Sequence, residues 1–176
     1  MVIYFLRHAS AGESLANPKK DEKRALDKTG IAQCGEVGRA LTALDVQVDV
    51  ILSSPLKRSA QTAALVGNEL GYEGKLLFED ALRPAATFAD FRKMLEKHAK
   101  LENVMVVGHN PNLSEFLGRS ISASGCEASV ELKKGAVARV EMNRNSGSML
   151  WCITPKVLRS VYATAADNSR PKTSRK

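Results

Sequence analysis

The sequence predicts an α/β domain with a mostly parallel central sheet flanked by helices. Three short apolar segments, 2–6, 48–54 and 104–108, have the composition of buried strands. Segments with helical periodicity separate them along the chain. Strands that alternate with helices form parallel sheets, because each helix returns the chain to the edge where the previous strand began. We therefore expect the 176 residues to form one domain of this class.

The segments between these strands have the spacing of amphipathic helices. In the first, 31–44, apolar residues recur every three or four positions and form one face. The members of that face are Cys34, Val37, Leu41 and Leu44. The segment 56–70 begins after a proline and ends before a glycine, which is a usual entry and exit for a helix. Two further helices are expected in 88–100 and 111–120, where apolar residues again share one face.

The domain is predicted to end in a β-hairpin. Apolar segments 136–142 and 149–153 flank the polar sequence NRNSGS, which is typical of a turn between antiparallel strands. Residues 1–160 are assigned to the domain, and residues 161–176 to a basic, flexible tail. The reason is that the last ten residues are polar, lack aromatic side chains and carry +3 of the net charge.

Composition is typical of a soluble globular protein, with 44% hydrophobic and 26% charged residues. No apolar run approaches the roughly 20 residues of a membrane span, and the N-terminus lacks the features of a signal peptide. Three cysteines without CxxC spacing are typical of reduced thiols. We therefore expect a cytoplasmic protein that does not bind membranes.

Several ligand classes are not indicated. The net charge of +7 would suit a nucleic acid, yet no aromatic residues alternate with the basic ones and no nucleic-acid motif is present. The sequence contains no P-loop, no GxGxxG and no spaced set of cysteines and histidines for zinc. We expect no nucleic-acid partner, no cofactor and no metal.

Reactive side chains follow all three predicted parallel strands. Arg7 and His8 follow the first, Arg58 lies in the first turn of the helix after the second, and His109 follows the third. Ligand sites of open α/β sheets lie beyond the carboxyl ends of the strands, so these four side chains are expected to meet. Taken singly, each is explained equally well by a solvated strand end or an exposed helix face.

Two guanidinium groups and two imidazoles beside helix N-termini suit a compact anion such as phosphate. The planar fork of arginine binds two phosphate oxygens at once. Binding alone does not need two histidines. One neutral imidazole can attack phosphorus, while the other, if protonated, stabilises charge on the equatorial oxygens.

Three motifs, LRHA, SSPLKRSAQTA and VGHNP, resemble in order and spacing those of the histidine phosphatase superfamily, which has the phosphoglycerate mutase-like fold. The resemblance covers roughly residues 1–160 and implies a three-layer architecture. It implies that His8 is the phosphorylated nucleophile and that Arg7, Arg58 and His109 complete the catalytic phosphate pocket.

Within the superfamily, the chain is most similar to the small SixA-like phosphohistidine phosphatases, which lack the large helical insert of mutases and acid phosphatases. The segment KRALDKTG, 23–30, resembles the RPLTxxG segment of that branch and adds Arg24 as a candidate substrate-binding residue. Ala25 and Asp27 replace the usual Pro and Thr of that segment, and the chain departs from the family at two further positions. Ala9 stands where glycine commonly follows the histidine, and Pro84 stands where mutases carry a general-acid glutamate.

These features lead to the hypothesis of a phosphohistidine protein phosphatase with a covalent phosphohistidine intermediate. An alkoxide is a poor leaving group that needs a placed proton donor, whereas an imidazole leaves readily, so the missing glutamate favours N–P substrates unless Glu13, Glu79 or Asp80 reaches the site. The expected substrate is a phosphorylated protein, such as a histidine-containing phosphotransfer domain, and the enzyme is expected to be a monomer. Two alternatives stay open: a phosphatase of the same fold for phosphoserine, phosphothreonine or small esters, and a non-catalytic phosphate-binding adaptor.

Overall fold

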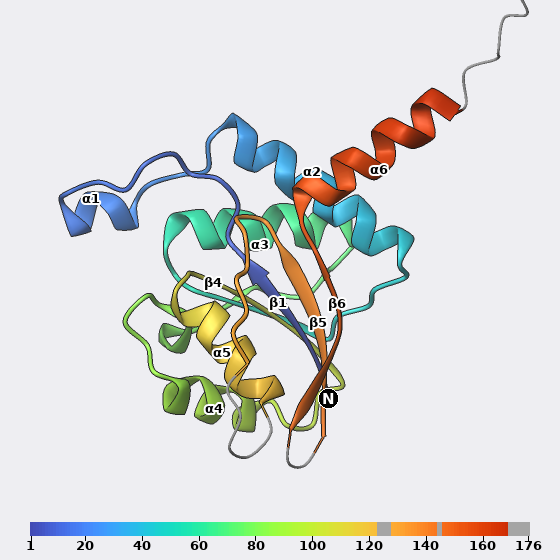
Figure 1. Ribbon diagram of the computed structural model, residues 1–176. Helices are drawn as coiled ribbons and strands as arrows, with labels where there is room; N and C mark the ends of the chain where they lie inside the picture. The colour runs from blue at the N-terminus through green and yellow to red at the C-terminus, as the bar shows by residue number, and fades with distance from the viewer. Residues whose placement is uncertain (123–127, 144–145, 169–176) are drawn as a thin grey trace, which may run out of the picture.

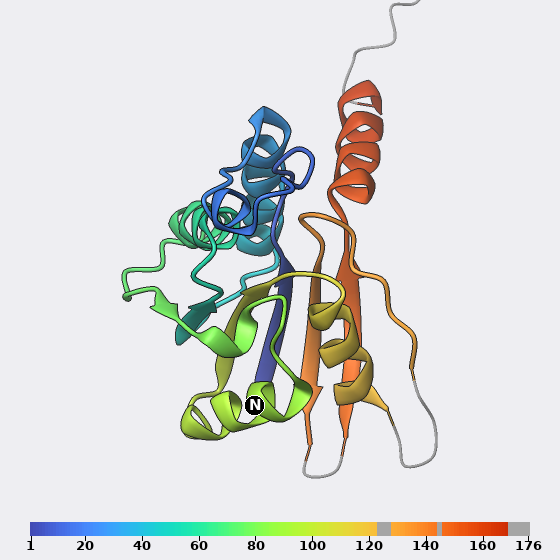
Figure 2. The same cartoon turned by 90° about the vertical axis from the view of Figure 1, so that its left-hand side faces the viewer.

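The computed structural model describes residues 1–122, 128–143 and 146–168. Within these residues, six strands form one mixed sheet that lies between two layers of helices (Figures 1 and 2). The strands are β1 (Val2–Arg7), β2 (Val50–Ser53), β3 (Leu77–Phe78), β4 (Asn103–Gly108), β5 (Val137–Met142) and β6 (Gly147–Ile153). The helices are α1 (Pro18–Glu22), α2 (Lys28–Ala43), α3 (Lys57–Glu69), the 3-10 helix η1 (Asp80–Leu82), α4 (Phe88–Lys97), α5 (Asn112–Ile121) and α6 (Pro155–Asn168).

The strands lie in the order β3-β2-β4-β1-β5-β6. Strands β1 to β4 run parallel to one another, β5 is antiparallel to β1, and β6 is antiparallel to β5. The three strands predicted to be parallel neighbours are the adjacent strands β2, β4 and β1. The predicted hairpin is the β5–β6 pair at one edge of the sheet. The fold class expected from the sequence is therefore confirmed.

Each face of the sheet buries its own core. Helices α2, α3 and α6 pack on one face, and α4 and α5 pack on the other. The central strands β1 and β4 contribute side chains to both cores, which explains why their sequences are apolar over residues 2–6 and 104–108. On the α4–α5 side, the rings of Phe91 and Phe116 stack with centroids 4.9 Å apart. Burial from both sides holds the ends of β1 and β4 in fixed positions.

Helix α2 begins earlier than the predicted residue 31, because Asp27 caps its N-terminus and accepts a hydrogen bond from the Gly30 N–H at 2.7 Å. The same carboxylate accepts hydrogen bonds from the Ser10 hydroxyl and the Gly12 N–H, so it also anchors the loop after β1. Three of the four residues predicted to form the apolar face are buried. The exception is Leu44, which follows the last residue of the helix and is exposed.

The boundary predicted at residue 160 falls within α6, so residues 161–168 are helical rather than a flexible tail. The helix projects away from the sheet (Figures 1 and 2). Alanine is the best helix former, and three alanines in this segment favour continuation of the helix. The remainder of the predicted tail, 169–176, lies outside the described residues. In the part of the chain that is described, no helix is long and apolar enough to cross a membrane.

Candidate active site

The sheet brings the two histidines together at the ends of β1 and β4. In this parallel pair Arg7 lies opposite Gly108, so His8 and His109 occupy equivalent positions one residue further on. The His8 N–H donates to the Gly108 carbonyl at 3.0 Å. The two imidazole rings are 5.0 Å apart between centroids and tilted by 57°. Both side chains are buried, with 7% and 3% of their surface exposed.

The surroundings of His8 determine its tautomer and its charge. Nδ1 lies 2.8 Å from the Ala9 carbonyl oxygen, which can only accept, so Nδ1 carries the proton and Nε2 keeps its lone pair. Burial, together with the positive charges of Arg58 and Arg7, lowers the pKa of His8 to about 4. His8 is therefore a neutral imidazole near pH 7, with its nucleophilic nitrogen unprotonated.

His109 is held by two serine hydroxyls. Its Nε2 lies 2.8 Å from Oγ of Ser54 and 3.2 Å from Oγ of Ser59, whereas its Nδ1 is buried and has no partner within the described residues. Burial, followed by the charges of His8 and Arg58, lowers the pKa of His109 to about 2. The sequence analysis expected a protonated His109, but in the protein without a bound ligand this histidine is neutral near pH 7. Negative charge beside the ring is needed to raise this pKa.

Arg7 and Arg58 are each anchored through Nη1. Nη1 of Arg7 donates to the Leu132 carbonyl at 2.7 Å, and Nη1 of Arg58 donates to the carbonyl oxygen of Asp21 at 2.9 Å and to its Oδ2 at 3.1 Å. In both arginines Nε is buried without a partner among the described residues. An unpaired buried N–H is costly, and an oxyanion bound along the Nε edge of each fork would satisfy it.

Arg24 joins this group through Asp21, a residue that the sequence analysis did not single out. Nε of Arg24 donates to Oδ1 of Asp21 at 2.8 Å, and its Nη1 donates to the carbonyls of Ala11 and Gly12. The positive charge of Arg24 contributes to the lowered pKa values of both histidines, which places it within electrostatic range of the site. The spacing of three residues between Asp21, in α1, and Arg24, just beyond its end, was the available sequence signal.

Thr62 connects the loop after β1 to helix α3. Its Oγ1 accepts from the Ala9 N–H at 3.1 Å and donates to the Arg58 carbonyl at 2.8 Å. Ala9 itself is fully buried, and Asp45 is the only non-glycine residue with positive φ in the described ranges. Alanine is therefore accommodated at position 9 without backbone strain, although the family commonly has glycine there.

The carboxylates considered as general acids lie in other surroundings. Oε1 of Glu79 is 3.9 Å from Nε2 of His98, and Oδ1 of Asp80 accepts from Nε of Arg83 at 2.6 Å. Glu13 is exposed in the loop before α1. Two of the three are therefore paired with basic side chains other than His8 and His109.

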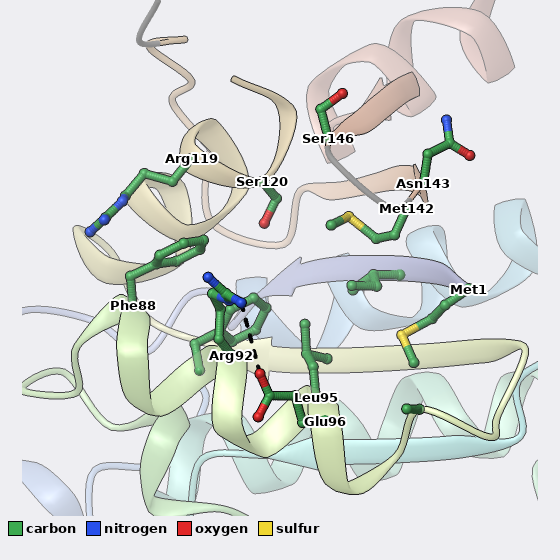
Figure 3. A pocket seen from close by; sticks show the side chains of 13 residues that line it. Met1, Phe88, Arg92, Leu95, Glu96, Arg119, Ser120, Met142, Asn143 and Ser146 are labelled. Atoms are coloured by element: carbon green, nitrogen blue, oxygen red, sulfur yellow. Dashed lines mark ion pairs between the residues drawn. The ribbon is translucent and has the colours of Figure 1, made fainter. Parts of the chain in front are cut away.

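A separate pocket lies beyond the opposite end of β1 (Figure 3). It has a volume of about 410 Å³ and is lined mainly by apolar side chains, including Met1 and Phe88, with Arg92 and Arg119 among its polar residues. None of the site residues predicted from the sequence lines it.

Comparison with known proteins agrees with this architecture. A family model described as the histidine phosphatase superfamily (branch 1) matches residues 3–87, which include Arg7, His8 and Arg58. An uncharacterised protein of Picosynechococcus sp. is 31% identical over 140 residues, a stretch that covers 78% of this chain and 82% of that protein. The chain belongs to the histidine phosphatase superfamily.

Solved structures share the fold along nearly the whole chain. The protein histidine phosphatase SixA, complexed with tungstate, superposes with a TM-score of 0.80 at 22% identity and covers 90% of this chain and 99% of its own. A phosphoglycerate mutase from Bacillus anthracis superposes with a TM-score of 0.70 at 13% identity and covers 90% and 95%. The phosphoglycerate mutase-like fold is thereby established.

Proposed function

We propose that the protein is a phosphohistidine phosphatase that forms a covalent intermediate on Nε2 of His8. The observation that carries the proposal is the pair of buried, neutral imidazoles 5.0 Å apart. Beside them lie two arginines whose Nε–H groups have no partner in the described residues. A phosphoryl group between these side chains would meet a nucleophile and two guanidinium forks together.

In the first step, the lone pair of Nε2 attacks phosphorus in line with the leaving group. The Nε2–P bond forms, the N–P bond of the substrate breaks, and the departing nitrogen takes a proton from solvent. Arg7 and Arg58 stabilise the charge on the transferring oxygens through their Nε edges. In the second step, water attacks phosphorus, the electron pair of the Nε2–P bond returns to His8, and phosphate leaves while the water proton passes to solvent.

His109 contributes a hydrogen bond to the same oxygens. When Ser54 and Ser59 donate to Nε2, the imidazole proton resides on Nδ1, the nitrogen without a partner among the described residues. The negative phosphoryl oxygens raise the pKa of His109 from its low value in the protein alone. Phosphate binding thus favours the protonated ring that the transition state needs.

The ionised state of Asp21, the carboxylate that contacts Arg58, favours a substrate with an N–P bond. Asp21 contacts Arg58, but its Arg24 partner and the Leu15 N–H lower its pKa to about 2, so it holds no proton to donate near neutrality. Phosphohistidine needs no strong acid, because its leaving imidazole is readily protonated. Under this proposal the substrate is a phosphorylated protein, such as a histidine-containing phosphotransfer domain, and the enzyme acts as a monomer in the cytoplasm.

The second candidate is a phosphatase for phosphoserine, phosphothreonine or small phosphate esters, which the likeness to a phosphoglycerate mutase favours. The two are distinguished by comparing kcat/KM on a phosphohistidine protein, a phosphoserine peptide and an aryl phosphate. We expect the first to be preferred at least tenfold. A preference for either ester would replace the proposal by the second candidate.

The nucleophile is tested with His8→Ala and with a radiolabelled phosphohistidine protein. The wild-type protein should trap label in an acid-labile, base-stable bond, and the variant should trap none and turn over no substrate. A variant that binds phosphate but behaves like the wild type in turnover would exclude His8. Phosphate binding without turnover by the wild-type protein on any of these substrates would instead indicate a phosphate-binding adaptor.

A further inference from the structure

The carboxylate of Asp21 lies between two arginines of the candidate site. One oxygen accepts from Arg24, and the other accepts from Arg58. We propose that Asp21 is a positioning residue that orients both guanidinium groups toward the transferring phosphoryl group. The inference rests on the proposed function in one respect, namely that the site binds a phosphoryl group.

The hydrogen bonds of Arg58 show what Asp21 controls. Nη1 of an arginine carries two hydrogens, and both meet oxygens of Asp21, the carbonyl at 2.9 Å and Oδ2 at 3.1 Å. The guanidinium plane is therefore held from one end, and the Nε edge remains for a ligand. Without the carboxylate, Nη1 would keep only the carbonyl acceptor, and the plane could turn away from the bidentate orientation.

Arg24 is held in a similar way. Its Nε donates to Oδ1 of Asp21, while its Nη1 donates to the carbonyls of Ala11 and Gly12 at 2.7 and 3.1 Å. The Leu15 N–H donates to the same Oδ1 at 2.9 Å and fixes the carboxylate from the other side. Asp21 therefore ties the segment between β1 and α2 to helix α3, which carries Arg58.

The charge of Asp21 also matters for the arginines. Burial lowers the pKa of Arg58 and the charge of Arg24 lowers it as well, whereas Asp21 raises that pKa and so offsets part of both effects. The side chain of Asp21 is 18% exposed, and its pKa of about 2 keeps it ionised at all pH values at which the protein would work. Its contribution is a fixed negative charge and two fixed acceptors, not a proton.

The test compares Asp21→Asn with Glu22→Gln, a matched loss of one carboxylate on the same short helix. Glu22 pairs with Arg83 at the surface, and its charge acts on Arg58 more weakly than that of Asp21. Affinities for inorganic phosphate and orthovanadate are measured by calorimetry, with melting temperatures as a check on folding. We expect Asp21→Asn to lower the affinity for both anions about tenfold or more, because hydrogen bonds to charged groups are strong. Glu22→Gln should change these affinities less than about twofold.

A double-mutant cycle with Arg58→Ala separates orientation from a general structural effect. If Asp21 acts through Arg58, its removal costs much less affinity once Arg58 is absent, about threefold at most. The positioning role of Asp21 would be overturned, and the proposed function left standing, by either of two results. One is an equal loss of affinity on replacing Asp21 in the presence and in the absence of Arg58, and the other is a phosphate affinity in Asp21→Asn equal to that of the wild type. A wild-type protein that binds neither anion would overturn the proposed function together with it.

Discussion

Oγ of Ser54 lies 2.8 Å from Nε2 of His109, and both groups are buried at the carboxyl ends of the adjacent strands β2 and β4. A hydroxyl that donates to Nε2 places the imidazole proton on Nδ1. Nδ1 is the nitrogen that the described residues leave without a partner. We propose that the Ser54 hydroxyl donates to Nε2 and so selects the tautomer whose Nδ1–H can donate to a bound oxyanion.

Replacing Ser54 by alanine should lower kcat about tenfold with little change in KM, because a lost positioning hydrogen bond of about 1.4 kcal/mol corresponds to that factor. Ser53→Ala is the control, since Ser53 is equally buried but donates to the Ser54 carbonyl. Steady-state kinetics on the same substrate measure both. Equal losses in the two variants would point to packing instead of tautomer control.

Replacing Arg58 by lysine should lower kcat/KM about a hundredfold even though the positive charge is kept. Lysine has no Nε–Nη2 edge and cannot bind two oxygens in one plane. Arg159→Lys provides the control, because Arg159 forms a surface pair with Glu36. Wild-type activity in Arg58→Lys would show that charge alone suffices at this position.

The protonation of the histidines can be followed by NMR titration, with signals assigned from histidine-to-glutamine variants. In the protein alone, His8 and His109 should both stay neutral from pH 8 down to pH 5.5, because burial lowers their pKa values to about 4 and about 2. Saturation with tungstate should raise the pKa of His109 far enough that its ring takes up a proton within this pH range. An unchanged His109 signal in the complex would argue against its role as a charged donor.

Folding stability should fall as the pH drops below about 6.5. Unfolded histidine takes up a proton near that pH, whereas folded His8 does so only near pH 4, so the unfolded state binds more protons in this window. At pH 4 the loss attributable to His8 is about 3 kcal/mol relative to pH 7. Urea unfolding at pH 7, 5 and 4 should show a smaller decline for His8→Gln than for the wild type.

The central part of the fold could be predicted because β1, β2 and β4 each consist mainly of an uninterrupted apolar run. The same continuity placed His8, Arg58 and His109 at strand ends and helix starts that meet in space. Two elements that were not predicted lack any apolar pattern. Strand β3 has two residues, both exposed, and α1 has no buried residue, so neither leaves a periodic signal.

The charge of His109 and the role of Asp21 could not be derived from the sequence. A pKa depends on the depth of burial and on charges from other elements, in this case His8 and Arg58. The partners of Asp21 include Arg58, a residue from α3 that is remote in sequence. Such relationships exist only once the strands and helices have packed together.

Three residues of the site are secured to main-chain oxygens: His8 to the Ala9 carbonyl, Arg7 to that of Leu132, and Arg58 to that of Asp21. Every amino acid supplies a carbonyl, so these anchors persist when the residue that provides them mutates. The orientation of these side chains therefore depends on the path of the backbone more than on which amino acid supplies the carbonyl. Sequences that share this path can therefore differ at the anchoring positions while they retain the same orientation of His8, Arg7 and Arg58.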